Sequence, residues 1–417
     1  MTSLGLSFAL MAVAFLVTTL VYPYVLQFAR RHNMVDNPNA RKLQRVPVPL
    51  MGGTTVFIGL FVAVVAACFF MWDVRLPEIL ALLLVMYALG VWDDAKDVSP
   101  ALRFAVEILV VWLIIIILGV EINDFHGLWG IRAVPDIISV PLSIVAGVGI
   151  MNAVNLIDGV DGYCSSFGMM ACIVFGIVFY YAGDMVMFTI ALISIGALLP
   201  FFFHNVFGKT SKMFLGDGGS LMLGTLLTLF TFSTLASDSP CAQYSDDGIS
   251  LVALCLAVLA VPVFDTLKVM IFRVARGQSP FHPDKTHLHH LFIELGYTHL
   301  ATSAIIVATN AMIIVVLAVA WLLGASINLQ VYIVILLALL VTWGFYFFME
   351  AQHRRNHGRG TKLYHRWSVR GERRHAELAP LWWFLRRVVD SRFLGGTPPP
   401  RPATQDQKPT KIDPRIR

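Results

Sequence analysis

The sequence predicts an all-α protein, a polytopic membrane bundle of about eleven transmembrane helices. Of its 417 residues, 57% are hydrophobic and 14% are charged, and the mean hydropathy is +0.72. A soluble domain carries roughly a quarter charged residues, so this composition excludes an ordinary soluble enzyme. The apolar residues also gather in runs of about 20, the length of helix that crosses a bilayer. A disordered chain and a small disulfide-bonded domain are excluded as well.

Eleven apolar segments predict the helices in order. They lie near residues 4–28, 51–71, 77–92, 101–120, 137–151, 164–182, 186–203, 219–236, 249–272, 301–323 and 327–349. The segments near 77–92 and 137–151 are short, so we expect them to be tilted or partly buried against neighbours. The first segment is too long for a signal peptide and no A-x-A cleavage site follows it, so we expect a retained helix.

Basic residues predict which loops face the cytoplasm, because short loops rich in Lys and Arg stay inside. Alternate loops hold Arg30, Arg31, Arg41, Lys42, Arg45, Lys96, Lys209, Lys212, Arg273, Arg276 and Lys285. The other loops hold only Arg75 and Arg132. This asymmetry places the amino terminus outside and, after eleven spans, the carboxyl terminus in the cytoplasm.

The chain divides at about residue 350 into a membrane domain, residues 1–350, and a tail, residues 351–417. The tail is basic, then aromatic at Trp382 and Trp383, then Pro-rich near 398–400. Such a basic stretch lies on anionic lipid or forms a solvated, partly disordered cytoplasmic tail. Because the positive-inside rule explains the charge, we expect no nucleic-acid partner.

Four polar clusters interrupt the apolar background. They are Asp93-Asp94 at the end of the third segment and residues 152–162, 214–220 and 282–290 at the ends of later segments. Ionisable groups are rare in membrane segments, so such clusters indicate a functional site. The predicted topology places all four on the cytoplasmic face.

The first two clusters offer carboxylates and amides. Asp93 and Asp94 repel each other and gain from a divalent cation or a cationic partner, although solvated loop acids would look the same. Asn152, Asn155 and Asp158 recur every three residues, a spacing that suits hydrogen bonds to a nucleobase or sugar. Helix capping and turn formation are the alternative.

The third cluster places Asp217 among glycines before a helix. Backbone N–H groups at a helix start suit phosphate oxygens, and Asp217 is placed to hold Mg²⁺. A glycine-rich packing turn is the alternative. The motif lacks the Gly-Lys-Ser/Thr of a Walker A loop.

The fourth cluster combines histidines with nearby cations. Its histidines are His287, His289 and His290, which follow Arg273 and Arg276. No Cys or Glu stands at zinc-protease spacing, so hydrogen bonds to a diphosphate explain the cluster better than zinc. Together the four clusters predict a site for a nucleotide diphosphate with Mg²⁺, suited to phosphoryl transfer.

The motifs resemble those of the polyprenyl-phosphate N-acetylhexosamine-1-phosphate transferases, a glycosyltransferase 4 family. Asp93-Asp94, the N-x-x-N-x-x-D-G-x-D-G run from Asn152, the F-x-G-D-x-G-S run from Phe214 and H-x-H-H from His287 stand in the family's order. The resemblance covers residues 1–350, and residues 279–290 look closest to the WecA branch.

The resemblance implies the reaction of UDP-GlcNAc with undecaprenyl phosphate to give GlcNAc-pyrophosphoryl-undecaprenol and UMP. Mg²⁺, or Mn²⁺ in its place, is the implied cofactor, and the bilayer and a second copy of the chain are the implied partners. The product would start a cell-surface polysaccharide of the O-antigen or lipopolysaccharide type. Another UDP-sugar, such as UDP-GalNAc or UDP-MurNAc-pentapeptide, remains an alternative.

Residue roles follow from the same resemblance and from the clusters. We assign to catalysis Asp93, Asp94, Asp158 and His287, with Asp93 resembling the family's base. We assign Asp217 to Mg²⁺. We assign to substrate binding Lys42, Asn152, Asn155, Asp161, Phe214, Arg273, Arg276, His289 and His290.

Two further alternatives stay open. The mechanism is either direct attack by the lipid phosphate or a two-step route through an aspartyl intermediate on Asp93 or Asp94. A secondary transporter is the rival function, although transporter sites normally lie near the bilayer midplane rather than at span ends.

Overall fold

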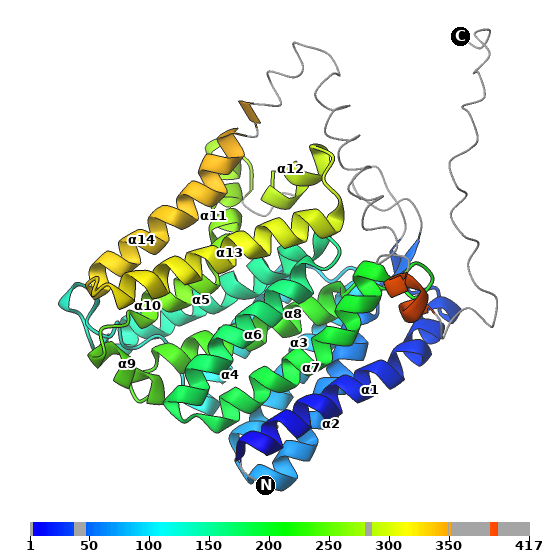
Figure 1. Ribbon diagram of the computed structural model, residues 1–417, viewed down its shortest axis with the longest axis horizontal. Coiled ribbons are helices and arrows are strands. Elements are labelled where there is room, and N and C mark those ends of the chain that lie inside the picture. The colour runs from blue at the N-terminus through cyan, green and yellow to red at the C-terminus, as the bar shows by residue number, and fades with distance from the viewer. Residues whose placement is uncertain (1–2, 37–46, 280–285, 349, 352–383, 391–417) are drawn as a thin grey trace.

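The computed structural model describes residues 3–36, 47–279, 286–348, 350–351 and 384–390. They form a bundle of long helices (Figure 1). The helices are α1 (Ser3–Arg31), α2 (Gly52–Met71), α3 (Arg75–Lys96), α4 (Pro100–Leu118), α5 (Asp136–Leu156), α6 (Tyr163–Ala182), α7 (Met185–Phe207), α8 (Gly216–Leu235), α9 (Gln243–Asp246), α10 (Leu251–Val258), α11 (Ala260–Ala275), α12 (Leu288–Glu294), α13 (His299–Leu322) and α14 (Ile327–Leu339). Two short strands, β1 (Val35–Asp36) and β2 (Val48–Pro49), pair antiparallel.

The all-α membrane bundle is confirmed. Ten described helices are long and apolar enough to cross a membrane, and α10 with α11 forms an eleventh candidate. The two segments that looked short belong to full-length helices of 22 and 21 residues, α3 and α5. Their polar ends, which carry site motifs, continue the helix beyond the apolar run.

The ninth predicted span is broken. Helices α10 and α11 are bent by 74° where Leu259 separates them. Asn310 of α13 bonds the break from the side: its Nδ2 donates to the carbonyl oxygens of Ala257 (3.1 Å) and Val258 (3.0 Å), and its Oδ1 accepts from Val261 N (2.9 Å). Broken helices are tolerated in a membrane when neighbouring side chains bond the freed backbone groups in this way.

Helix α8 is the centre of the bundle. Asp217 is its only residue that is not fully buried. Glycines let α2 and α3 approach it: a Cβ on Gly53 would lie 2.4 Å from Gly219 N, and one on Gly90 would lie 2.3 Å from Asp217 O. The start of α8 is therefore a joint between three helices.

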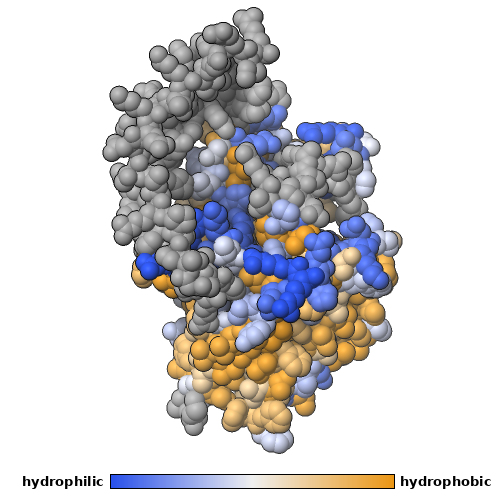
Figure 2. Space-filling model, turned by 90° about the vertical axis from the view of Figure 1, so that its right-hand side faces the viewer, coloured by the Kyte–Doolittle hydropathy of each residue, from blue (hydrophilic) through white to orange (hydrophobic). Residues whose placement is uncertain are grey.

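The polar motifs gather at one end of the bundle, which we call the site end. It contains the carboxyl ends of α3, α5 and α11 and the amino ends of α8 and α13, together with α12. Figure 2 shows hydrophilic residues in the upper half of the view and an apolar surface below them. Exposed large apolar side chains, among them Phe69, Tyr181 and Leu322, are those expected to face lipid.

A piece of the tail docks at the site end. Residues 384–390 are helical, and Asp390 accepts hydrogen bonds from Lys209 N (3.1 Å), Ser211 N (3.0 Å) and Ser211 Oγ (2.7 Å). Burial raises the pKa of the Asp390 carboxyl, but these hydrogen bonds outweigh it and hold the pKa below its usual value. This part of the tail therefore lies on the same side of the bundle as the polar motifs, while the division at residue 350 stays a prediction.

Candidate functional site

Two aspartates from other helices cap the start of α8. Asp94, in the last turn of α3, accepts from Asp217 N (3.1 Å) and Gly218 N (3.3 Å), and Asp158 accepts from Gly216 N (3.1 Å). The first N–H groups of a helix lack partners within it, and carboxylates are good acceptors for them. The N–H groups that the sequence offered to a phosphate are therefore already bonded to protein.

A half-buried arginine that sequence reasoning missed holds the acidic residues together. Arg103 Nη1 lies 3.2 Å from Asp93 Oδ2 and 3.8 Å from Asp217 Oδ2, and Arg103 Nε lies 3.1 Å from Glu107 Oε1. Glu107 Oε2 in turn accepts from Asn152 Nδ2 at 2.5 Å. An Arg and a Glu one turn apart inside an apolar segment were the available signal, because charges there normally mark function.

Asp217 is the most accessible acid of this group. Its side chain is 34% exposed, against 12% for Asp93 and 1% for Glu107. Its Oδ1 accepts from Asn155 Nδ2 at 2.6 Å, and the same amide also donates to Ser220 Oγ at 2.9 Å. Asp217 is thus oriented by Asn155 and open to a ligand.

Asp161 lies in a second, partly charged corner. Its Oδ2 is 2.6 Å from Lys212 Nζ and 3.0 Å from His299 Nδ1, while its buried Oδ1 has no hydrogen-bond partner among the described residues. Burial raises the pKa of Asp161, but His299 and Lys212 outweigh it and hold the pKa below its usual value. The Lys212 ammonium also lies 5.5 Å from the centre of the half-buried Phe214 ring. The Asp161 carboxylate is therefore a charged hydrogen-bond acceptor, and the Phe214 ring lies near it.

The three histidines belong to α12 and its first cap. The rings of His287 and His289 stack 5.7 Å apart, and those of His289 and His290 lie 4.3 Å apart. A Cβ on Gly159 would lie 3.1 Å from His289 Nε2, so the histidines adjoin the loop between Asp158 and Asp161. Burial, followed by the nearby His290 and His287, lowers the pKa of His289, which is therefore neutral at pH 7.

Three further residues were predicted to bind the substrate: Arg273, Arg276 and Lys42. Arg273 is buried near the carboxyl end of α11, whereas Arg276 is exposed just beyond it. Arg276 takes no part in the hydrogen bonds and ion pairs of the described acidic cluster. Lys42 lies outside the described residues.

The chain is similar in sequence to known proteins of one family. The sequence pattern of glycosyl transferase family 4 matches residues 76–235, from the start of α3 to the end of α8. A decaprenyl-phosphate N-acetylglucosaminephosphotransferase of Mycolicibacterium smegmatis is 30% identical over 307 residues, which are 69% of this chain and 75% of that protein. The chain belongs to the polyprenyl-phosphate N-acetylglucosamine-1-phosphate transferase family.

Other relatives of this transferase carry similar names. A probable undecaprenyl-phosphate N-acetylglucosaminyl 1-phosphate transferase of Bacillus subtilis is 27% identical over 337 residues, 79% of this chain and 88% of that protein. The undecaprenyl-phosphate alpha-N-acetylglucosaminyl 1-phosphate transferase of Escherichia coli K12 is 26% identical over 309 residues, 72% of this chain and 80% of that protein.

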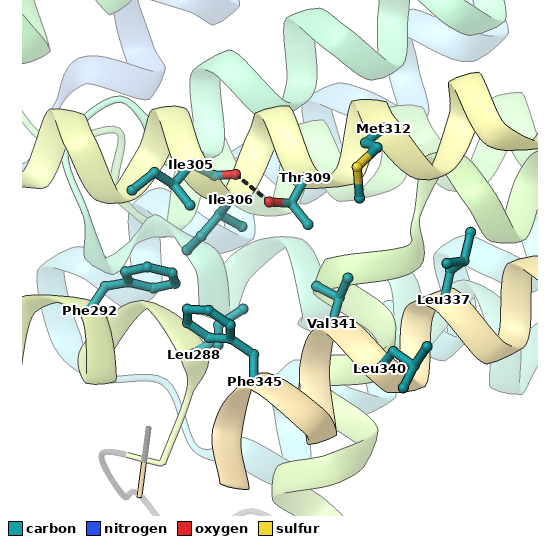
Figure 3. A pocket seen from close by; sticks show the side chains of 10 residues that line it. All are labelled: Leu288, Phe292, Ile305, Ile306, Thr309, Met312, Leu337, Leu340, Val341 and Phe345. Atoms are coloured by element: carbon teal, nitrogen blue, oxygen red, sulfur yellow. Dashed lines mark hydrogen bonds between the residues drawn. The ribbon is translucent and has the colours of Figure 1, made fainter. Parts of the chain in front are cut away.

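An apolar pocket of about 270 Å³ lies beside α12 of the transferase (Figure 3). Its lining comes from α12, α13 and the last turns of the α14 span, and it includes Leu288, the residue after His287. Thr309 is its one hydroxyl-bearing lining residue, and Thr309 Oγ1 donates to Ile305 O (2.7 Å). The pocket therefore suits a hydrocarbon chain.

Proposed function

We propose that this transferase moves GlcNAc-1-phosphate from UDP-GlcNAc to undecaprenyl phosphate, giving GlcNAc-pyrophosphoryl-undecaprenol and UMP. The observation that carries the proposal is the convergence of separate polar motifs around Asp217, at one end of an apolar bundle. Asp94 caps the helix that carries Asp217, Asn155 donates a hydrogen bond to the Asp217 side chain, and Arg103 lies beside that side chain. A lipid phosphate and a water-soluble nucleotide meet at such a boundary.

Mg²⁺ fits the residues around Asp217. Among the described residues no three His, Cys, Asp or Glu side chains are arranged to enclose a metal ion. Mg²⁺ does not need such a cage, because it binds through one or two carboxylates together with substrate phosphates and water. Asp217 is the accessible oxygen ligand, and Asp93 and Glu107 add negative charge that only Arg103 balances in the described cluster. When bound, the ion would neutralise charge on the diphosphate.

Direct attack by the lipid phosphate is the favoured route. An oxygen of the acceptor phosphate bonds to the β-phosphorus, and the bond from that phosphorus to the bridging oxygen breaks as UMP leaves. A phosphate monoester is largely dianionic at pH 7, so it needs little activation. Asp94 uses both oxygens to cap α8, and Asp93 uses its oxygens for Val98 N and Arg103. An aspartyl nucleophile would first have to give up these bonds.

We assign the corner around Asp161 to the uracil base. Uracil has one ring N–H, and the unpartnered Oδ1 of Asp161 is an acceptor for such a donor. Phe214 offers a face on which the base can stack, with the Lys212 charge above it. The alternative donors UDP-GalNAc and UDP-MurNAc-pentapeptide share this base, so the corner selects for uridine and not for a sugar.

We assign the apolar pocket beside His287 to part of the polyprenyl chain. Its walls come from the membrane-spanning helices α13 and α14 and from α12, whose first residue, Leu288, follows His287. An acceptor whose chain occupied this pocket would bring its phosphate to the site end. Apolar pockets with few polar groups are typical of lipid and cofactor sites.

We further propose that the site end faces the cytoplasm and that the product starts a cell-surface polysaccharide. Lys96, Lys209 and Lys212 lie at this end, as the positive-inside rule requires of a cytoplasmic face. The docked helix at 384–390 would then be cytoplasmic, and the amino terminus would be outside.

The test is transfer of label from sugar-labelled UDP-GlcNAc into a lipid-extractable product by purified protein with undecaprenyl phosphate and Mg²⁺. We expect labelled lipid from the wild type, and none with EDTA or with Asp217→Asn. Asp184→Asn is the matched control, because Asp184 is a buried acid paired with Arg75 far from these motifs.

Three other outcomes would contradict the proposal in whole or in part. Product from another UDP-sugar alone would keep the chemistry and refute GlcNAc as the substrate. Product formed with decaprenyl phosphate but not with undecaprenyl phosphate would refute undecaprenyl phosphate as the acceptor. No product from any pair, with folded protein, would refute the proposal and favour transport, which a flux assay without sugar nucleotide would test.

A further inference from the structure

Helix α11 carries a buried ion pair that the mechanism above does not use. Asp265 Oδ1 lies 2.6 Å from Lys268 Nζ, and Lys268 is 0% exposed. The ammonium also lies 4.9 Å from the centre of the Tyr346 ring. Burying two charges is costly unless further hydrogen bonds satisfy them, so an isolated pair of this kind adds little to stability.

The other bonds of Asp265 go to the start of α12. Its Oδ2 lies 3.0 Å from His287 Nδ1, and Leu288 N donates to both oxygens at 3.1 and 3.2 Å. Asp265 thereby caps α12 and holds the His287 ring with the same carboxylate. Because a carboxylate accepts hydrogen bonds, it fixes the proton of the imidazole on Nδ1.

The Asp265 carboxylate does not use the second ring nitrogen of His287, Nε2. The atom is buried and has no hydrogen-bond partner among the described residues. A buried polar atom without a partner is costly, so it calls for an explanation such as a ligand. The ring stacks on His289, which adjoins Gly159 and thus the polar motifs. In the pair formed by Asp265 and His287, Nε2 is therefore the atom available to a substrate.

We propose that Asp265 is a positioning residue that holds His287 with its proton on Nδ1 and its Nε2 free for the substrate. Lys268 Nζ, 2.6 Å from Asp265 Oδ1, balances the carboxylate charge. With the proton on Nδ1, Nε2 accepts a hydrogen bond, so its partner is a donor on the sugar, a hydroxyl or the acetamido N–H. The sugar as partner rests on the proposed transferase function, whereas the hold of Asp265 on His287 rests on the contacts alone.

The kinetic test compares Asp265→Asn, His287→Gln and the double variant in the label-transfer assay. Loss of a carboxylate that orients a metal-binding histidine typically costs 10- to 100-fold in activity, and we use the same scale for Asp265. We expect Asp265→Asn to lower kcat about 10-fold or more with a smaller change in KM for UDP-GlcNAc. Because Asp265 acts through His287, the double variant should be no slower than His287→Gln. Asp184→Asn, a buried ion-pair acid at the opposite end, should keep the wild-type kcat.

Two results would overturn the proposal. Multiplicative losses in the double variant would show that Asp265 acts independently of His287, as a purely structural residue does. A second measurement needs no activity: nitrogen-15 NMR of histidine-labelled protein, with His287 assigned by its loss in His287→Gln. The Nδ1–H tautomer is expected, and an Nε2–H tautomer refutes the positioning role even if the wild type proves inactive.

Discussion

Replacing Asn310 by leucine tests how the broken span is held. The change removes three hydrogen bonds of 2.9–3.1 Å and leaves two carbonyl oxygens and one N–H at the break without their side-chain partner. Side-chain hydrogen bonds measured inside membrane proteins average about 0.6 kcal/mol, whereas an unsatisfied buried group costs about 1–3 kcal/mol. We therefore expect a loss of at least about 2 kcal/mol in stability.

The assay is thermal unfolding of purified protein in detergent, followed by residual transferase activity. Thr309→Val is the matched control, because among the described residues Thr309 Oγ1 bonds only to Ile305 O of its own helix. Its loss leaves the helix bonds intact and should cost less than about 0.5 kcal/mol, as most substitutions outside such features do. Since α11 carries Asp265, Asn310→Leu should also lose activity below its melting temperature. Equal melting temperatures for the two variants would refute the role given to Asn310.

Three further predictions concern the site end. Arg103→Met removes the cation between Asp93 and Glu107 and should lower kcat about 10²-fold or more in the label-transfer assay, as loss of one preorganised charge does; an unchanged kcat would contradict this. Gly219→Ala places a Cβ 2.7 Å from Gly53 Cα and should cost about 1–3 kcal/mol of stability in thermal unfolding. Gly149→Ala, where a Cβ meets nothing within 4 Å, is its control and should not destabilise the protein. The pKa of His289 is lowered by burial, so its contribution to stability is full above the ordinary value of 6.5 and is lost as the pH falls below it. Melting temperatures measured between about pH 8 and pH 5 should therefore fall less steeply for His289→Gln than for the wild type, and parallel curves would contradict this.

The long helices could be predicted because bilayer thickness fixes their length, and runs of apolar residues show it directly. The break in the ninth span was missed, although Pro262 gave a signal: a proline suits the first turn of a helix, and Pro262 lies in the first turn of α11. Hydropathy is averaged over many residues, so one proline does not interrupt the apolar segment and the break was not predicted.

The site was only partly predictable for a related reason. Motifs that stand at the ends of apolar runs, such as Asp217 and its glycines, were visible in the sequence. Arg103, Glu107, Asp265 and Lys268 lie inside apolar segments, where averaging hides single charges. Their partners come from other helices, and a sequence does not show which faces of two helices meet. That Asp94 caps α8 could only be learned from the packing.

The capping of α8 bears on how the protein is made. No side chain adjacent to α8 in the sequence caps its first turn, and the acceptors for its N–H groups are supplied by Asp94 and Asp158. Both belong to earlier helices, so a ribosome delivers the acceptors to the membrane before the helix that needs them. The acceptors for the first turn of α8 have therefore already been synthesised when α8 leaves the ribosome. A gene split so that α8 began a separate polypeptide would remove that order.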